Sequence, residues 1–336
     1  MFRILLLSTF CLPLILRAES EPAKPELKPL AQRIADRAFP SVFQAWSPAD
    51  NLKGEDRFVT MARHDLVFHS APSFLNLAWK EASAGLGTEF TTESVGRAKI
   101  IRDKMRALNP NQIFLSEVRY RDAWDAYLPA DHKWWKRKPD GQRVPGWEEG
   151  KFYILDFQNA EFRAHVARQC KAIVETGLAD GVMLDWWEDD EDRLALIKAI
   201  REAIGEQALI LVNANDRQIP RTAQFINGVF MECYRSKSAD DWARIETTLA
   251  WAEEHLRQPR INCVETWYEK SRQDLNRMRA TTTLSLTRSD GYCLFSDPNE
   301  LPSPDHLHDW YPFWDKSLGK ATGKGKLRPD GAWERD

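Results

Sequence analysis

The chain has 336 residues, of which 43% are hydrophobic and 29% are charged, and its formal net charge is -3. Acidic and basic residues are interspersed, without the strongly basic footprint of a nucleic-acid-binding protein, so no nucleic-acid partner is predicted. The 14 tryptophans exceed what packing alone requires, and flat indole faces are surfaces on which sugar rings stack.

The amino-terminal residues have the features of a secretory signal peptide. Arg3 precedes an apolar run from residue 4 to residue 16, and Ala18 offers a small-residue cleavage site. This run is shorter than the roughly 20 apolar residues that a membrane-spanning helix needs. We therefore expect a secreted or periplasmic protein without a membrane span.

From Pro40 onward, short apolar and β-branched runs alternate with amphipathic stretches. This pattern is typical of a parallel sheet covered by helices. The expected strands are 41–46, 65–69, 112–118, 181–185, 208–212, 228–232, 261–265 and 292–295. The expected helices are 51–62, 95–108, one that Asn159 caps and Gly177 ends, one that ends before Gly205, 239–256 and 271–286.

Eight strands in alternation with helices favour a closed (β/α)8 TIM barrel of the α/β class over an open doubly wound sheet. The expected organisation is a signal peptide at 1–18, a linker at 19–36, a single barrel domain at 37–315 and a flexible tail at 316–336. A long aromatic insertion, 119–153, follows the third strand. Oligomeric state cannot be deduced from the sequence.

Polar side chains follow the apolar runs where the strands end, and in such barrels the active site is built at this carboxyl-terminal rim. Several carboxylates at one rim raise one another's pKa, which can supply a protonated acid beside an ionised carboxylate near neutral pH. The residues concerned are Glu117, Asp185, Glu188, Asn213, Asn215, Asp216, Glu232, Glu265 and Asp297.

Asp185 and Glu232 are the candidate catalytic pair. Asp185 ends a strand of pure apolar residues and precedes Trp186 and Trp187, two indoles that cannot both point inward from one strand. For Glu117 a simple ion pair with a following arginine competes with a functional role. Glu265 and Asp297 fit substrate binding or framework equally well.

Other chemistries have weaker signals. Cys170, Cys233, Cys263 and Cys293 lie far apart in apolar stretches, without a CxxC pair, so we expect buried thiols. The sequence has no HExxH and no GxSxG motif. No cofactor is implied, although a metal-dependent hydrolase that uses His64 or His69 with Asp297 stays an alternative.

Two motifs resemble known glycosidase barrels. Residues 180–187 (DGVMLDWW), preceded by 155–163 (LDFQNAEFR), are similar to α-galactosidase-like barrels and to the family 114 endo-α-1,4-polygalactosaminidases. Residues 42–46 (VFQAW) and 62–67 (ARHDLV) most resemble the hypothetical glycosyl hydrolase family numbered fifteen. The similarity spans about residues 39–297.

The resemblance implies a glycoside hydrolase in which the Asp of strand four is the nucleophile and the acid of strand six is the general acid/base. These positions are Asp185 and Glu232, and the implied route is retaining. The α-galactosidases usually have Asp at the second position, so Glu232 departs towards the galactosaminidase-like pattern. The expected partner is an oligo- or polysaccharide, whose identity the motifs do not specify.

Substrate-binding residues are expected around this pair. They are Trp46, Glu117, Trp135, Trp186, Trp187, Asn213, Asn215, Glu265, Trp267 and Asp297. The competing hypothesis is a barrel without catalysis that binds glycans through Trp46, Trp135, Trp186, Trp187 and Trp267.

The insertion 119–153 is predicted to form a wall of the substrate cleft. It carries aromatic residues, among them Trp134 and Trp135, and a set of basic residues that would favour an acidic or anionic glycan. The alternative is a cap that only covers apolar surface at the rim.

Overall fold

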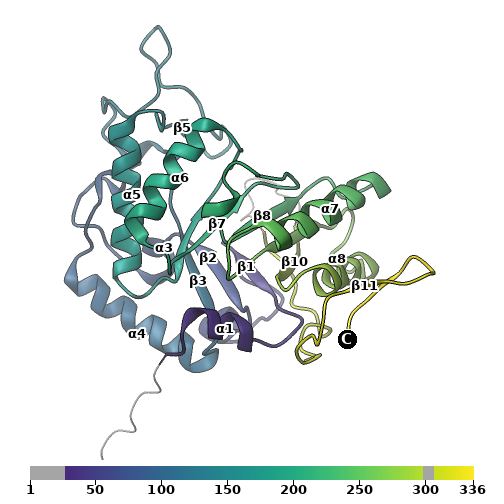
Figure 1. The fold of residues 1–336 in the computed structure, drawn as a ribbon. Helices are drawn as coiled ribbons and strands as arrows, with labels where there is room; N and C mark the ends of the chain where they lie inside the picture. Colours follow the sequence, from purple (N-terminus) through teal and green to yellow (C-terminus); the bar gives the residue numbers. More distant parts are fainter. Residues whose placement is uncertain (1–26, 298–305) are drawn as a thin grey trace, which may run out of the picture.

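The computed structural model describes residues 27–297 and 306–336, and within them an eight-stranded parallel sheet forms the centre of the molecule (Figure 1). The predicted signal peptide lies outside the described residues. All eight predicted strands are confirmed, with boundaries that differ by no more than two residues. They are β1 Phe43–Ala45, β2 Leu66–His69, β3 Ile113–Glu117, β6 Gly181–Leu184, β7 Leu209–Asn213, β8 Gly228–Cys233, β9 Cys263–Trp267 and β10 Tyr292–Ser296.

The sheet closes into the predicted barrel. Its strand order is β1-β2-β3-β6-β7-β8-β9-β10, and Val42 pairs in parallel with Cys293, so β10 also lies beside β1. At the base of β6 a Cβ on Gly181 would stand 2.0 Å from the carbonyl oxygen of Leu209, so only glycine fits beside β7 there.

Side chains alternate between the two faces of each strand, as the period of two requires. Phe43, Leu115, Met183, Leu211 and Phe230 belong to the buried cluster inside the barrel. The apolar neighbours of the last four along β3, β6, β7 and β8 belong to a second cluster that packs against the surrounding helices. Because parity is fixed, the residue two positions after each inward-facing apolar residue also points into the barrel.

Helices surround the strands (Figure 1). Asn159 caps α5 by accepting from the amides of Glu161 and Phe162, as predicted, and Gly177 follows its end with φ +67°. The helices are α1 Leu30–Asp36, α2 Arg57–Ala62, α3 Ala71–Leu75, α4 Thr92–Leu108, α5 Ala160–Glu175, α6 Glu191–Ile204, α7 Ala239–His255 and α8 Leu275–Arg288, with 3-10 turns η1 Ala84–Leu86, η2 Asp125–Tyr127 and η3 Ala223–Phe225.

The structure differs from the predicted organisation at both ends of the barrel domain. Part of the expected linker forms α1, which lies beneath the barrel and buries Arg33 against Asp180 at the base of β6 (Figure 1). Part of the expected flexible tail forms a short hairpin, β11 Lys326–Leu327 with β12 Trp333–Glu334. Arg288 of α8 stacks on Trp333. Both segments therefore pack on the barrel.

The insertion 119–153 is an ordered structure at the rim. Its two ends pair as the antiparallel strands β4 Asp122–Trp124 and β5 Phe152–Ile154. Its tip, where Arg137 pairs with Arg143, stands clear of the body at the top of Figure 1.

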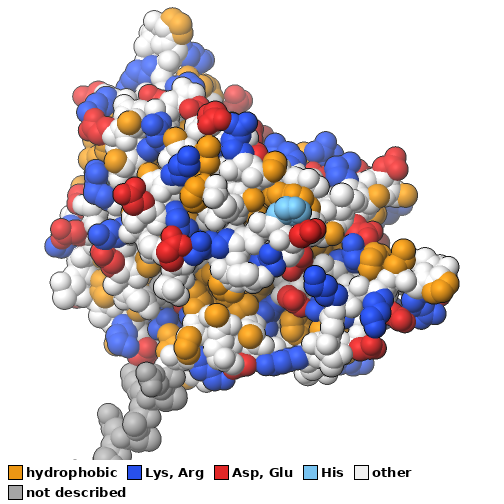
Figure 2. Space-filling model, viewed as in Figure 1, with side chains coloured by type: hydrophobic (Ala, Val, Ile, Leu, Met, Phe, Trp, Pro, Cys, Tyr) orange, Lys and Arg blue, Asp and Glu red, His pale blue; other side chains and the backbone are white. Residues whose placement is uncertain are grey.

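Acidic and basic side chains are interspersed over the face shown in Figure 2. The four cysteines of the described chain are free and buried, as predicted. No helix in residues 27–297 and 306–336 combines the length and apolar character needed to cross a membrane.

Candidate active site

Five inward-facing polar side chains lie at the carboxyl-terminal end of the barrel. Each lies two residues after a side chain that points into the barrel, so it points inward as well. Asp185 follows Met183 in this way, for example, and Glu232 follows Phe230. Since neighbouring parallel strands end at the same rim, these side chains meet there. The five are Glu117, Asp185, Asn213, Glu232 and Glu265.

Asn213 joins the two candidate catalytic carboxylates. Its Nδ2 donates to Asp185 Oδ1 at 2.9 Å and to Glu232 Oε2 at 2.8 Å. Asn213 is buried, and its own Oδ1 accepts from the backbone amide of Asn215 at 3.1 Å, which fixes the orientation of the amide group. One amide nitrogen thus holds both acids in a defined mutual position.

The surroundings of this pair favour the protonated acid at Glu232. Burial, together with the neighbouring carboxylates Glu265 and Asp185, raises the pKa of Glu232 to about 7, against the opposing effect of His306. Burial also raises the pKa of Asp185, while the nearby Arg119 guanidinium opposes this rise. The site therefore holds a carboxyl group that can carry a proton near neutral pH beside one with a cationic neighbour.

Glu265 and His306 form a buried dyad next to Glu232. Glu265 is opposite Glu232 in the β8–β9 register and is 0% exposed. Its carboxylate lies 2.8 and 3.0 Å from Nδ1 of His306 and accepts from Ser296 Oγ at 2.5 Å. The imidazole also stacks on Trp46, with ring centroids 5.0 Å apart. Glu265 thus fixes the position of His306, whose imidazole lowers the pKa of the neighbouring Glu232.

A second set of contacts lies on the β1–β3 side. Trp46 Nε1 donates to Glu117 Oε2 at 2.9 Å, and Arg119 Nε lies 2.9 Å from Glu117 Oε1. Glu117 is therefore an ion-paired group that positions Trp46 and Arg119. The structure therefore contains the alternative predicted for Glu117, an ion pair with a following arginine, which is Arg119.

These residues surround a cleft of about 540 Å³. Asp185, Glu232 and Asn213 lie in it, and its aromatic lining consists of Trp46, Trp147, Trp186, Tyr234 and Trp267. Trp186 is 46% exposed, with the Arg121 guanidinium 4.5 Å from its ring centroid. A cleft that combines aromatic side chains with convergent polar groups is a suitable site for a polar organic ligand.

The backbone around the cleft is locally strained. Four lining residues, Trp46, Trp186, Asn215 and His306, have φ between +49° and +58° without being glycine. Such conformations cost about 1 to 3 kcal/mol each and concentrate at functional sites. At Trp186 the surroundings hold the strained turn, because Tyr120 Oη and Arg193 donate to its carbonyl oxygen at 2.8 and 3.1 Å.

Five residues expected to contact substrate do not line the cleft: Glu117 and Glu265, whose partners are given above, and Trp187, Trp135 and Asp297. Trp187 is fully buried, and its indole donates to Thr222 Oγ1 at 3.2 Å. Trp135 is 2% exposed and donates to the carbonyl oxygen of Pro129 at 2.9 Å. Asp297 is paired with Arg272 at 2.7 Å. Trp187 packs in the core because successive residues at the end of β6 face opposite ways, whereas Trp135 is buried together with its neighbour Trp134.

The insertion 119–153 forms part of the wall of the cleft and also covers apolar surface at the rim. Trp147 and Glu149 line the cleft, whereas Trp134 and Trp135 are buried and cover the apolar surface beneath. The basic residues on which an anionic glycan was expected do not line the cleft; Lys133 pairs with Glu161 and Arg143 with Asp125.

His64, His69 and Asp297 are not brought together. His64 is buried with its Nε2 2.9 Å from Nε2 of His308, His69 stacks on Phe74, and Asp297 pairs with Arg272. Within the described ranges no group of three His, Cys, Asp or Glu side chains could hold a metal ion.

Sequence reasoning missed His306 and Tyr234 as lining residues and considered Arg119 only as an ion-pair partner of Glu117. Arg119 and Tyr234 each follow a strand-end carboxylate by two residues, which could have drawn attention to them. His306 lies beyond the last strand and reaches the rim only through tertiary structure, so no local pattern identifies it.

The fold and the site together define the class of this protein as a (β/α)8 barrel with paired carboxylates at its carboxyl-terminal rim. Comparison of the sequence with protein-family models gives no match, and comparison with curated proteins gives none either.

Solved structures share the fold. The chain is similar to cyclic α-maltosyl-(1→6)-maltose hydrolase from Arthrobacter globiformis, with TM-score 0.51 and 11% identity over 85% of this chain and 80% of that chain. It is also similar to the noncanonic maltogenic α-amylase AmyB from Thermotoga neapolitana, with TM-score 0.50 and 13% identity over 79% and 73%. The glycoside hydrolase domain of a PelA variant from Pseudomonas aeruginosa gives TM-score 0.49 and 14% identity over 81% and 99%. At these identities the first two likenesses show the barrel fold alone.

Proposed function

We propose that this protein is a glycoside hydrolase that cleaves O-glycosidic bonds with retention, with Asp185 as nucleophile and Glu232 as general acid/base. The observation that carries the proposal is the Asn213 amide that binds one oxygen of each carboxylate at the floor of an aromatic cleft. The signal-like residues 1–18 support an exported enzyme. The names of the solved barrels and the resemblance of residues 180–187 to glycosidase motifs support the reaction class.

The separation of the two acids is compatible with retention. Since both oxygens bind the same nitrogen, at 2.9 and 2.8 Å, the oxygens lie closer together than the sum of these distances. This limit fits the roughly 5 to 5.5 Å between the carboxyl groups of retaining enzymes. It restricts only the two oxygens that Asn213 binds, so the configuration of the product decides between retention and the inverting route, whose carboxyl groups are about 6.5 to 9.5 Å apart.

The chemistry then takes two steps. Asp185 attacks the anomeric carbon while Glu232 gives its proton to the departing glycosidic oxygen, which leaves a glycosyl ester on Asp185. Glu232, now ionised, removes a proton from water as the water oxygen attacks the anomeric carbon. The ester bond breaks, and both carboxyl groups return to their starting states. Asn213 positions both acids, and Arg119 stabilises the ionised Asp185.

A panel of plant and bacterial polysaccharides tests the proposal by the release of reducing ends, and it includes a galactosamine polymer because of the motif resemblance. We expect Asp185→Asn and Glu232→Gln each to lower turnover about a hundredfold to ten-thousandfold or more, without a fall in unfolding temperature. Glu202→Gln, which changes an exposed carboxylate of α6, is the matched control.

The configuration of the first product, followed by nuclear magnetic resonance, tests retention separately. Inverted product would replace the nucleophile role of Asp185 by that of a general base. Binding of oligosaccharide without any released ends would make the protein a glycan-binding barrel, the competing hypothesis.

A further inference from the structure

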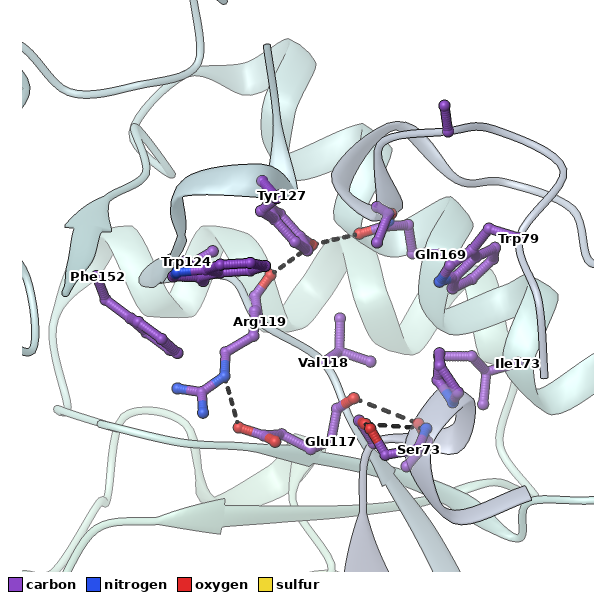
Figure 3. A pocket seen from close by; sticks show the side chains of 17 residues that line it. Ser73, Trp79, Glu117, Val118, Arg119, Trp124, Tyr127, Phe152, Gln169 and Ile173 are labelled. Carbon is purple, nitrogen blue, oxygen red and sulfur yellow. Dashed lines mark hydrogen bonds and ion pairs between the residues drawn. The ribbon is translucent and has the colours of Figure 1, made fainter. Parts of the chain in front are cut away.

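A second cavity lies beside the cleft, on the outer side of β3 (Figure 3). Its volume is about 460 Å³, and its walls come from the loop after β2, from α5 and from the insertion 119–153. Asp185 and Glu232 do not line this side pocket, but Arg119 lines both it and the cleft. The two spaces are therefore separated by little more than one side chain.

The walls of the side pocket are aromatic and aliphatic. Trp124, Tyr127 and Phe152 come from the insertion, and Val118 and Ile173 complete the opposite side (Figure 3). Trp124 is 58% exposed, although a large indole gains about 25 cal/mol for each Å² of apolar surface removed from water. An exposed indole at the edge of an apolar cavity is typical of a ligand site.

Three polar side chains of the lining, Tyr127, Gln169 and Ser116, already have partners within the protein. Tyr127 Oη lies 3.1 Å from both Gln169 Oε1 and the carbonyl oxygen of Arg119, and Gln169 Nε2 donates to Ala84 O at 3.0 Å. Ser116 Oγ accepts from the amide of Ala71 at 3.1 Å. A sugar ring needs hydroxyl partners, and these engaged groups would have to break existing bonds to supply them.

The charged lining residues also neutralise each other. Arg119 and Glu117 form an ion pair at 2.9 Å, and the other oxygen of Glu117 accepts from Trp46 at 2.9 Å. An ionic ligand would have to compete with this pair. The chemistry of the lining thus selects an uncharged group without many hydroxyls.

We propose that the side pocket binds an uncharged aromatic or short aliphatic group and holds the apolar part of a glycoconjugate whose sugar lies in the cleft. The assignment of the sugar to the cleft rests on the proposed function; the preference of the pocket for an apolar group does not. Arg119, which forms a wall of both spaces, contacts both parts of such a ligand.

Fluorescence titration with N-phenyl-1-naphthylamine, an uncharged probe that brightens in apolar surroundings, tests the pocket directly. We expect the native protein to bind one probe molecule. Ala126→Phe, which fills the pocket from an exposed lining position, should weaken this binding about tenfold or more. Trp124→Ala removes a wall and weakens binding in the same direction. The matched control is Ala130→Phe, an exposed position of the insertion outside the lining, which changes binding less than about twofold.

Thermal unfolding of each variant establishes that it is folded. If Ala126→Phe and Trp124→Ala bind the probe as the native protein does, or if only Trp186→Ala abolishes binding, the side pocket does not bind apolar groups. If no glycan is cleaved but Ala126→Phe and Trp124→Ala weaken probe binding as expected, the apolar pocket is supported and the proposed hydrolase activity is contradicted. If glycans are cleaved but Ala126→Phe leaves probe binding unchanged, the hydrolase activity is supported and the apolar pocket is contradicted.

Discussion

At the scale of single residues, His306 should set the pH dependence of the proposed activity through its effect on the pKa of Glu232. General acid catalysis requires protonated Glu232, so kcat/KM should fall as pH rises through about 7, the pKa of this carboxyl. His306 lowers that pKa, so His306→Gln should move the alkaline limb upward by about one pH unit. Burial raises the pKa of Asp185, whose protonation sets the acid limb. Full pH profiles measure both limbs.

The exposed His255 of α7 provides the matched control, since His255→Gln removes an imidazole that does not line the cleft. A purely structural role for His306 would lower kcat without moving the alkaline limb. An unmoved limb would therefore contradict the electrostatic role.

Glu232 also makes the folded state less stable at high pH. Its pKa rises from 4.5 in a free side chain to about 7 on burial, so folding opposes ionisation. The stability that the neutral carboxyl contributes is complete below about pH 4.5 and is lost as pH rises towards 7. Glu232→Gln should therefore raise the free energy of unfolding by about 3 kcal/mol at pH 8 and by much less at pH 4.

Denaturant unfolding at the two pH values measures this difference, with Glu202→Gln as the exposed control that shows none. Equal effects of Glu232→Gln at both pH values would mean that the carboxyl is solvated in the folded protein. The prediction concerns stability alone and holds whatever the substrate is.

At the scale of elements, the period-two pattern of the strands was sufficient to predict the centre of the site. Asp185, Asn213 and Glu232 follow inward-facing apolar residues at fixed parity, and the structure brings them together through Asn213. The eight strands were predictable for the same reason, because each is a short apolar run between amphipathic helices.

Elements whose position depends on tertiary contacts could not be predicted in this way. Helix α1 is short and follows a proline-rich stretch, and a main reason it packs on the barrel is that Arg33 reaches Asp180 at the base. Trp135 and Trp187 have the same local signal as Trp186, but only their packing decides that they are buried. Aromatic composition thus identified a site with many indoles without telling which of them face it.

At the scale of the whole molecule, the two ends of the barrel have different tasks. The rim holds the positive-φ residues that line the cleft and the raised pKa values of Asp185 and Glu232, whereas an ion-paired cluster joins the elements at the base. Asp180 is buried there and forms ion pairs with Arg33 and Arg102, and Arg102 Nη2 lies 3.1 Å from Asp180 Oδ2. The carboxylate of Asp180 also accepts a hydrogen bond from the amide of Phe114 at 2.9 Å. One side chain thus connects α1, α4, β3 and β6. Barrels commonly separate stability at the base from chemistry at the rim.

This separation yields a prediction for Asp180→Ala. The variant leaves two buried guanidinium groups without their carboxylate, so the free energy of unfolding should fall by about 3 to 5 kcal/mol. Activity measured well below the unfolding temperature should stay within about twofold, since no cleft residue touches the cluster. Asp131→Ala, at an exposed position, should change stability by less than about 0.5 kcal/mol. Denaturant unfolding and initial rates on the same preparations measure both quantities. Loss of activity in folded Asp180→Ala would show that the base and the rim are coupled, because the base would then control the geometry of Asp185 through the intervening strand β6.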